Sequence, residues 1–169
     1  PQVDELKALG AAMAASGSVA LYYFEEGAPP APKGAEEISV SAKDLLQVRE
    51  ENAPDDEVDI VAVGCPHSSP EELEELARLL EGKTVERELW ICTARGVAER
   101  CPKLVEKIEG SGAKVFCDTC MVVSPASDRH QKMMVNSGKA FAYVPGLCKI
   151  KAAYGSTEEC VKAATRRVS

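Results

Sequence analysis

The sequence lacks an excess of basic residues and lacks any long apolar run. Acidic side chains outnumber basic ones by 27 to 20, which gives a net charge of −7. That balance argues against a nucleic-acid partner, because phosphates require a basic protein surface. No apolar run approaches the roughly 18–20 residues that a membrane span requires, and no signal peptide is recognisable. We therefore expect a cytoplasmic protein whose partners are neither nucleic acids nor membranes.

Signatures of several common sites are also missing. The sequence has no G-x-S-x-G elbow of a serine hydrolase, no P-loop spacing, and no second Cys-x-x-Cys that would complete a zinc site. It does have seven cysteines, in a 169-residue chain whose 45% apolar content can bury a core without disulfides. We interpret them as cytosolic thiols, some of which are available as metal ligands.

Short β-branched and aromatic runs alternate with helical patterns along the chain. Strands are expected at residues 18–24, 58–63, 88–93, 113–117 and 140–144. Helices are expected over residues 3–15 and 97–108, from Ser41 to Arg49, and from N-cap positions at Ser69 and Ser156. The alternation predicts one three-layer α/β domain over residues 1–169, with a mostly parallel sheet and helices on both faces. Residues 25–37, which contain three prolines, are predicted to form a flexible loop.

Cysteines follow two of the expected strands, where a parallel sheet binds its ligands. Cys65 follows one strand, and Cys117 and Cys120 form a Cys-x-x-Cys at the end of another. The Cys-x-x-Cys alone fits half of a zinc site, a redox dithiol or two core thiols. Together with Cys65 it gives three thiolates, enough for an iron–sulfur cluster that lacks one protein ligand. Metal binding and buried thiols stay equally open on the residues alone. The other four cysteines are expected to pack in the core: Cys92, Cys101, Cys148 and Cys160.

Polar candidates lie beside these cysteines. Arg95 follows a strand and suits a carboxylate or phosphate, the less favoured alternative being a surface pair with Glu99. His67 and Ser68 are candidates for proton transfer or hydroxyl binding, the alternative being that the serine only starts a helix. The Asn-Ser-Gly-Lys run at 136–139 could bind an anion through backbone and side-chain donors.

Four motifs in order make the chain resemble a known family. GCPHSS at 64–69, WICTARG at 90–96, FCDTCMVVSP at 116–125 and VNSGKAFAYVPG at 135–146 resemble the large subunit of the aconitase X family, a branch of the aconitase superfamily. The resemblance covers essentially the whole chain but only the later part of that subunit. Since the chain opens on a helix without an initiator Met, we expect it to be a fragment of a larger subunit.

The resemblance implies the metal-binding domain of an iron-dependent hydro-lyase. Cys65, Cys117 and Cys120 map onto the cysteines that hold an iron–sulfur cluster, with a two-iron cluster or a single iron as alternatives. Asn136 lies where aconitases place an asparagine near the cluster. Lys139 takes the place of a substrate-binding arginine, and this departure argues against a dicarboxylate substrate. The substrate-binding candidates are therefore Ser68, Arg95, Ser137 and Lys139, and His67 is the catalytic candidate.

The same resemblance implies partners and a substrate. The serine base of the superfamily lies in a swivelling domain that is a separate small subunit in archaeal members, so turnover would need that subunit and the remainder of the large subunit. The expected reaction is dehydration of (R)-5-phosphomevalonate to trans-anhydromevalonate 5-phosphate, with dehydration of cis-3-hydroxy-L-proline as the alternative. Outside this class, the sequence also fits a non-catalytic domain with buried thiols, or a dithiol oxidoreductase that uses Cys117 and Cys120.

Overall fold

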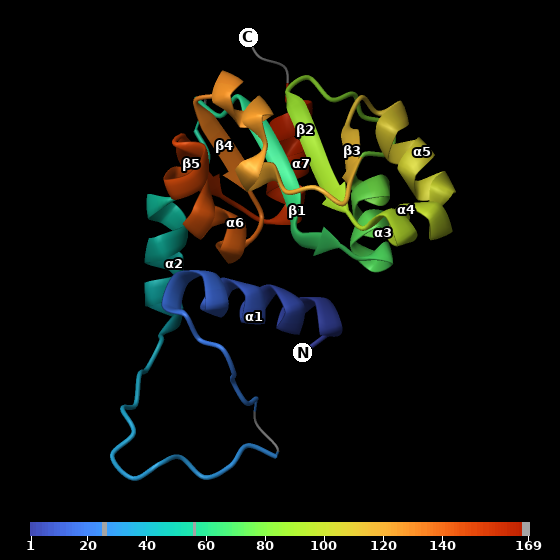
Figure 1. The fold of residues 1–169 in the computed structure, drawn as a ribbon. Helices are drawn as coiled ribbons and strands as arrows, with labels where there is room; N and C mark the ends of the chain where they lie inside the picture. Colours follow the sequence, from blue (N-terminus) through green and yellow to red (C-terminus); the bar gives the residue numbers. More distant parts are fainter. Residues whose placement is uncertain (25–26, 56, 167–169) are drawn as a thin grey trace.

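A five-stranded, fully parallel sheet forms the centre of the molecule (Figure 1). The computed structural model describes residues 1–24, 27–55 and 57–166. The strand order is β3-β2-β1-β4-β5, so the chain starts in the middle of the sheet and builds outward in both directions. The strands are β1 (Ile60–Ser68), β2 (Glu88–Thr93), β3 (Lys114–Cys117), β4 (Lys132–Val135) and β5 (Lys151–Tyr154). The predicted α/β fold with a parallel sheet is confirmed.

Helices cover both faces of this sheet. The α-helices are α1 (Val3–Gly17), α2 (Ala42–Glu51), α3 (Pro70–Leu79), α4 (Arg95–Arg100), α5 (Pro102–Gly110), α6 (Gly138–Tyr143) and α7 (Thr157–Thr165). Shorter helical turns are η1 (Met121–Val123), η2 (Pro125–Arg129) and η3 (Val144–Cys148). Among the described residues, no helix is both long enough and apolar enough to cross a membrane.

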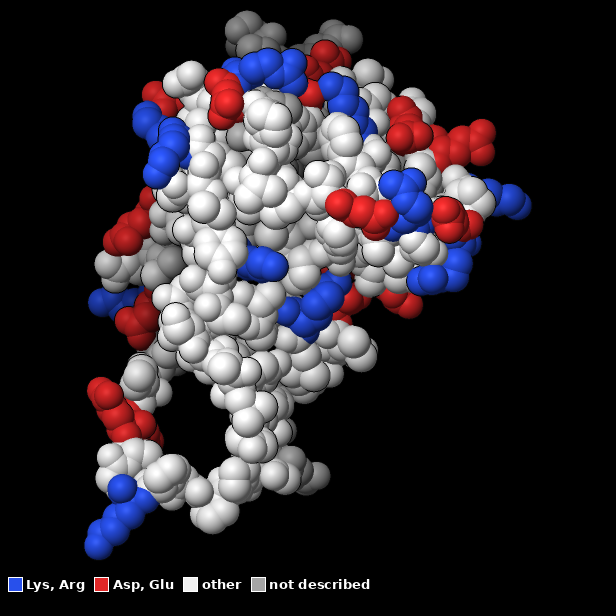
Figure 2. Space-filling model, in the orientation of Figure 1, with Lys and Arg blue, Asp and Glu red and all other residues white. Residues whose placement is uncertain are grey.

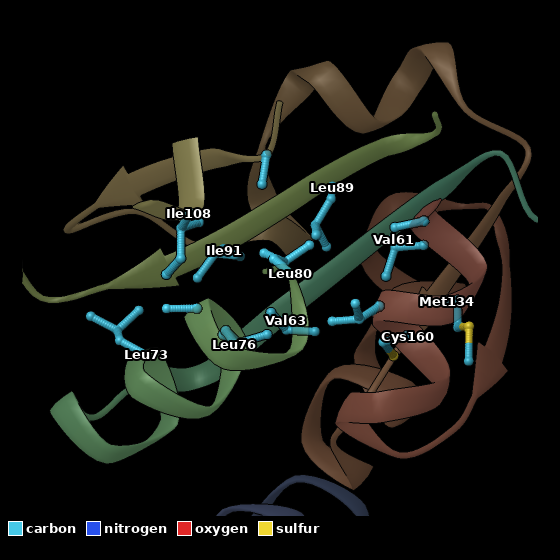
Figure 3. Packing of buried hydrophobic residues seen from close by; sticks show 14 of the residues in the cluster. Val61, Val63, Leu73, Leu76, Leu80, Leu89, Ile91, Ile108, Met134 and Cys160 are labelled. Carbon is cyan, nitrogen blue, oxygen red and sulfur yellow. The ribbon is translucent and has the colours of Figure 1, made fainter. Parts of the chain in front are cut away.

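Alternation along the strands divides the core into two clusters. One face of the sheet presents Val61, Val63 and Ile91 to α3, α5 and α7, and Cys160 of α7 points into this cluster (Figure 3). The opposite face presents Ala62 and Cys92 to the segments around α6, η1 and η3. The central strand β1 is buried on both faces, as its nearly continuous apolar sequence requires.

The predicted helix starts at Ser41, Ser69 and Ser156 are confirmed. Each of these serines accepts a hydrogen bond from the backbone N–H three residues later and forms a capping box with the acidic residue there. The single helix expected over 97–108 is instead two helices, α4 and α5. Pro102 opens the second of them, because a proline without an N–H suits a first helical position better than an interior one.

Two expected strands are wrong. Residues 18–24 contain no strand, and Leu21 and Tyr23 are 70% and 58% exposed. This segment turns back along α1, where the Tyr22 hydroxyl donates a hydrogen bond to the Leu6 carbonyl. The strand expected over 140–144 is mostly helix α6, because Ser137 caps a helix there. The strands β4 and β5 complete the five-stranded sheet beside β1.

Helix α1 lies across the carboxyl ends of the strands, and a long excursion connects it to α2 (Figure 1). Lys7 of α1 donates a hydrogen bond to the carbonyl of His67 at the end of β1. Residues 27–41 contain no helix or strand beyond short turns, while Glu25 and Glu26 of the predicted loop 25–37 lie outside the described residues. The flexibility of this loop stays a prediction.

Candidate metal centre

The site begins where β1 passes closest to β2. Gly64 has a φ of +92°, and a Cβ at this position would lie 2.1 Å from the Cys92 carbonyl oxygen. Only glycine can therefore occupy the position. The register between β1 and β2 shifts just after it, between Val63 and Ser68. This irregularity turns the chain so that Cys65 and His67 follow at the carboxyl edge of the sheet.

The three predicted cysteine ligands come together at this edge. Cys65 is 6% exposed, and Cys120 is close enough to raise the pKa of its thiol. Cys120 and Cys65 line a cavity of about 370 Å³ together with His67 and Lys139. Cys120 also lines an adjoining cavity of about 310 Å³ with Cys117. Cys120 thus lies between the other two cysteines.

Cys92 is a fourth thiol at the same place. It is buried on the strand beside Cys65 and lines the cavity that contains Cys117 and Cys120. The pKa of Cys92 is raised to about 11, mainly by burial; a backbone hydrogen bond from Met121 lowers it, and the charges that the three other cysteines would carry add to the rise. Sequence reasoning assigned Cys92 to the core but did not place it beside the Cys-x-x-Cys. The signal was its position in the strand register, opposite Phe116, the residue before Cys117.

Opposing effects act on the pKa of the Cys65 thiol. Burial raises the pKa of the Cys65 thiol, and the neighbouring Cys120 adds to that rise. The positive charge of Lys139 acts in the opposite direction and favours the thiolate. Lys139 is thus a basic group of this cavity that assists deprotonation of Cys65.

The three cysteine thiols are donors that suit a soft metal, but they do not converge on one point. Within residues 1–24, 27–55 and 57–166, no three Cys, His, Asp or Glu side chains converge closely enough to hold a single metal ion as they stand. Three thiols at one edge, two of them in contact and facing open cavities, nevertheless fit an iron or iron–sulfur group by donor chemistry.

His67 connects the two cysteine segments. Its Nε2 lies 2.7 Å from the carbonyl oxygen of Thr119, in the middle of the Cys-x-x-Cys. Because a carbonyl only accepts, the Nε2–H of His67 is the donor in this hydrogen bond. Thr119 was not among the sequence candidates, because only its backbone is used. A backbone contact between residues 52 positions apart leaves no signal in the sequence.

Arg95 faces a different part of the surface. Its backbone N–H and its Nε both bind the Asp118 carboxylate, at 2.9 and 3.0 Å. Its partner is therefore Asp118, not the Glu99 that the sequence suggested. The hydrogen bond from the Arg95 backbone N–H, with the charge of the guanidinium, holds the pKa of Asp118 below its ordinary value. Arg95 borders an open hollow that reaches Cys117, and it does not line the cavity of Cys65 and Lys139.

The remaining candidates, Ser68, Ser137 and Asn136, line a separate cavity beside Cys65. Ser68 and Ser137 are 4% and 8% exposed, and the Ser137 hydroxyl donates to the Cys65 carbonyl. The Asn136 amide donates to the Thr157 hydroxyl at 3.1 Å. These residues line a small cavity of about 50 Å³ on the other side of Cys65 from Lys139. Among the predicted substrate-binding residues, Lys139 lines the cavity that Cys65 and Cys120 line together.

The other three cysteines differ in how far they are buried. Cys148 and Cys160 are buried, and the Cys148 thiol donates to the Val122 carbonyl at 3.2 Å. Cys101 is only partly buried and lies at the junction of α4 and α5. All seven cysteines are free thiols. Core packing is confirmed for Cys148 and Cys160.

Comparison with known proteins gives consistent matches. Residues 58–166 match the model of the aconitase X third domain, and residues 1–50 match that of the second domain. In structure, the chain is similar to the holo form of aconitase X from Thermococcus kodakaraensis, with a TM-score of 0.82 and 34% identity over 96% of this chain and 44% of that one.

Curated relatives point the same way. The phosphomevalonate dehydratase large subunit of Methanosarcina mazei is 51% identical over 98% of this chain and 42% of its own length. The cis-3-hydroxy-L-proline dehydratase of Hypocrea jecorina is 32% identical over 97% of this chain and 31% of its own length. The chain therefore spans less than half of the relatives that it matches. On these matches, the chain belongs to the aconitase X family.

Proposed function

We propose that this chain supplies the iron-binding part of a hydro-lyase. The observation that carries the proposal is the meeting of Cys65, Cys120 and Lys139 on one cavity, with Cys117 beside it. A hydro-lyase of this type needs an electrophilic centre for the departing hydroxyl and a cation for an acidic substrate. The thiols supply the ligands for the first, and Lys139 supplies the second.

Cys65, Cys117 and Cys120 would hold an iron–sulfur cluster or a single iron. When bound, the iron supplies a Lewis acid that accepts a hydroxyl group. The other contributions of this chain come from its own side chains. Lys139 attracts the carboxylate or phosphate of the substrate, and the His67 side chain lines the same cavity. Cys92, with its pKa raised to about 11, stays protonated and unligated.

For the substrate, we propose (R)-5-phosphomevalonate, which would lose water to give trans-anhydromevalonate 5-phosphate. The support is the 51% identity to the large subunit from M. mazei, against 32% for the H. jecorina enzyme that acts on cis-3-hydroxy-L-proline. A cation such as Lys139 also suits a phosphorylated acid. Ser137 holds the Cys65 backbone in place through its hydroxyl, Ser68 and Asn136 line the small cavity beside Cys65, and Arg95 is kept as a candidate for the outer end of the substrate.

The proposal includes two protein partners and a location. A small subunit would carry the serine base, since the relatives are named large subunits. The remainder of the large subunit would cover the exposed apolar side chains within residues 18–24 and 38–48; the loop between α1 and α2 forms the mainly uncharged lowest part of Figure 2. Seven free thiols suit the reducing cytoplasm.

Iron and acid-labile sulfide content tests the metal assignment. The complete large subunit, with its small subunit, is reconstituted anaerobically as the parent and as Cys65→Ser, Cys117→Ser, Cys120→Ser and Cys92→Ser. We expect the first three variants to lose iron and Cys92→Ser to retain it. A parent that binds no iron would overturn the proposal in favour of a domain with buried thiols. A reversible disulfide between Cys117 and Cys120 in that iron-free protein would indicate a dithiol oxidoreductase.

Turnover tests the substrate. The iron-loaded heteromer is given 5-phosphomevalonate and cis-3-hydroxy-L-proline in parallel, and loss of each is followed by mass spectrometry. We expect dehydration of the phosphorylated acid only, and Lys139→Met should raise the KM for it. Dehydration of the hydroxyproline alone would overturn the substrate assignment and leave the iron assignment intact.

A further inference from the structure

Lys7 of helix α1 makes a direct contact with the end of β1. The Lys7 ammonium lies 2.6 Å from Glu72 Oε2, 2.8 Å from Asp4 Oδ1 and 3.3 Å from the carbonyl oxygen of His67. An ammonium group has three N–H donors, and here each has an acceptor. His67 is two residues after Cys65, so this contact holds the segment that carries a proposed ligand.

The same contact includes the start of α3. Glu72 Oε2 accepts from the Ser69 backbone N–H at 2.9 Å as well as from Lys7. The Ser69 hydroxyl donates to the second carboxylate oxygen of Asp4 at 2.7 Å. The cap of α3 and two residues of α1 are thus joined in one network. The chain between Cys65 and Ser69 has little freedom to move while the network is intact.

A second contact of α1 supports the other neighbour of Cys65. At Gly138, the first residue of α6, an added Cβ would lie 2.9 Å from the Cβ of Ala12. The N-cap of this helix, Ser137, donates its hydroxyl to the Cys65 carbonyl. Helix α1 therefore contacts both elements that fix the Cys65 backbone.

We propose that Lys7 is a positioning residue for the metal site: through the His67 carbonyl and Glu72 it holds the Cys65–His67 segment in place. Lys7 lies in the part that matches the second domain of the family, and Cys65 lies in the part that matches the third. The orientation of a third-domain ligand is thus set from the second domain. The role at an iron site rests on the proposed function, whereas the contact itself does not.

Thiol labelling in the iron-free heteromer tests this proposal. Alkylation of Cys65 by iodoacetamide is followed by mass spectrometry, with Cys148 as the internal reference because both residues are 6% exposed. In Lys7→Met we expect Cys65 to be labelled about tenfold faster than in the parent, relative to Cys148, because a local opening exposes only the first. Lys7→Arg, which keeps the ion pairs, should restore most of the protection.

The matched control is Lys107→Met, which removes a lysine paired with Glu81 at 2.9 Å on the exposed surface. It should leave Cys65 labelling unchanged. If Lys7→Met does not fold, Glu72→Gln is used, since an amide still accepts from the Ser69 N–H but loses the ion pair. We expect Glu72→Gln to give a smaller rise.

Two results would overturn the proposal: unchanged Cys65 labelling in folded Lys7→Met, or an equal rise at Cys65 and Cys148, which signals global unfolding. Iron content is then measured after reconstitution, and Lys7→Met should hold less iron per folded subunit than Lys107→Met. A labelling rise in a protein whose parent binds no iron would refute the proposed function and leave the positioning contact established.

Discussion

The Ser137 hydroxyl performs two tasks at once: it donates to the backbone carbonyl of Cys65 and accepts from the backbone N–H of Ala140. The first bond holds the later part of β1, and the second caps α6. Because Ser137 is 8% exposed, water does not easily replace either bond. A single buried side chain thus joins the cysteine segment to the helix that carries Lys139.

Ser137→Ala should therefore cost more than an ordinary cap. Loss of a serine N-cap destabilises a protein by about 1 kcal/mol, and the buried Cys65 carbonyl would also lose its partner, which adds about 1–2 kcal/mol. Ser156→Ala is the matched control, because Ser156 caps α7 without a contact to the site. Urea unfolding of both variants checks the difference, and equal losses would contradict the dual role.

Gly64→Ala should disrupt the site through the backbone. Its positive φ disfavours alanine by about 1–2 kcal/mol, and the added Cβ would also collide with the Cys92 backbone. Gly82→Ala is the control: its φ is +69°, but nothing lies within 4 Å of an added Cβ. We expect a loss of about 1 kcal/mol for Gly82→Ala and at least about 3 kcal/mol for Gly64→Ala. Similar midpoints in urea for the two variants would refute the close approach.

The elements predicted correctly from the sequence are those with a complete local signal. The helix at Ser69 has an N-cap serine, a proline in the first position and a glutamate that closes the capping box. The strand over Glu88–Thr93 is matched to the residue. The run over 140–144 looked like a strand because its residues are apolar and aromatic, but the cap at Ser137 decided for a helix. Strand propensity lost there to the cap, in which the Ser137 hydroxyl accepts from the Ala140 N–H.

Cys92→Ala should keep iron in the reconstituted heteromer. Cys92 is 1% exposed and its pKa is raised to about 11, so it is a poor thiolate donor at neutral pH. Removing its sulfur from the core should cost about 1–2 kcal/mol of stability. Iron content and thermal unfolding measured together check both statements. Loss of iron in a folded Cys92→Ala protein would make Cys92 a ligand.

The cysteines of the site were predictable because the strand-end rule acts on sequence positions. Cys65 and Cys120 meet as expected, since parallel strands bring their carboxyl ends to one edge. The same rule put Arg95 at that edge but could not show that Asp118, itself left-handed at φ 55°, would hold it. Lys7 was missed entirely, because its partner Glu72 is 65 positions away and an isolated lysine on a helix has no signature.

Buried thiols should make the chain less stable in alkali. Burial raises the pKa of Cys160 to about 12, whereas an unfolded thiol has a pKa near 8.5. Between these values the unfolded state releases a proton that the folded state keeps, so stability falls as pH rises, by up to about 1.4 kcal/mol per pH unit for one thiol. Cys160→Ala should flatten this fall above about pH 9 and leave the pH dependence below about pH 8 unchanged. If the free energy of unfolding of Cys160→Ala fell with pH in alkali as steeply as that of the parent, the burial effect would be contradicted.

The apolar surface around α2 gives a prediction about the larger subunit. Helix α2 has no buried residue, and Leu45 and Val48 on it are 64% and 58% exposed. Fully burying one leucine stabilises a protein by about 1.5–3 kcal/mol, so a cover over this surface would be worth several such contributions. Leu45→Lys should therefore lower the binding of the dye ANS by the 169-residue chain, because it removes an exposed apolar side chain.

In the complete large subunit the same change should instead destabilise, by about 2 kcal/mol, because a lysine would then be placed against the covering segment. Gln47→Lys adds the same charge to the same helix at an exposed polar position, where it removes only a hydrogen bond to Glu51. It should affect neither dye binding nor the stability of the complete subunit by more than about 0.5 kcal/mol. Equal effects of Leu45→Lys and Gln47→Lys in the complete subunit would mean that α2 stays open to solvent there, and that its apolar side chains have no partner within the large subunit.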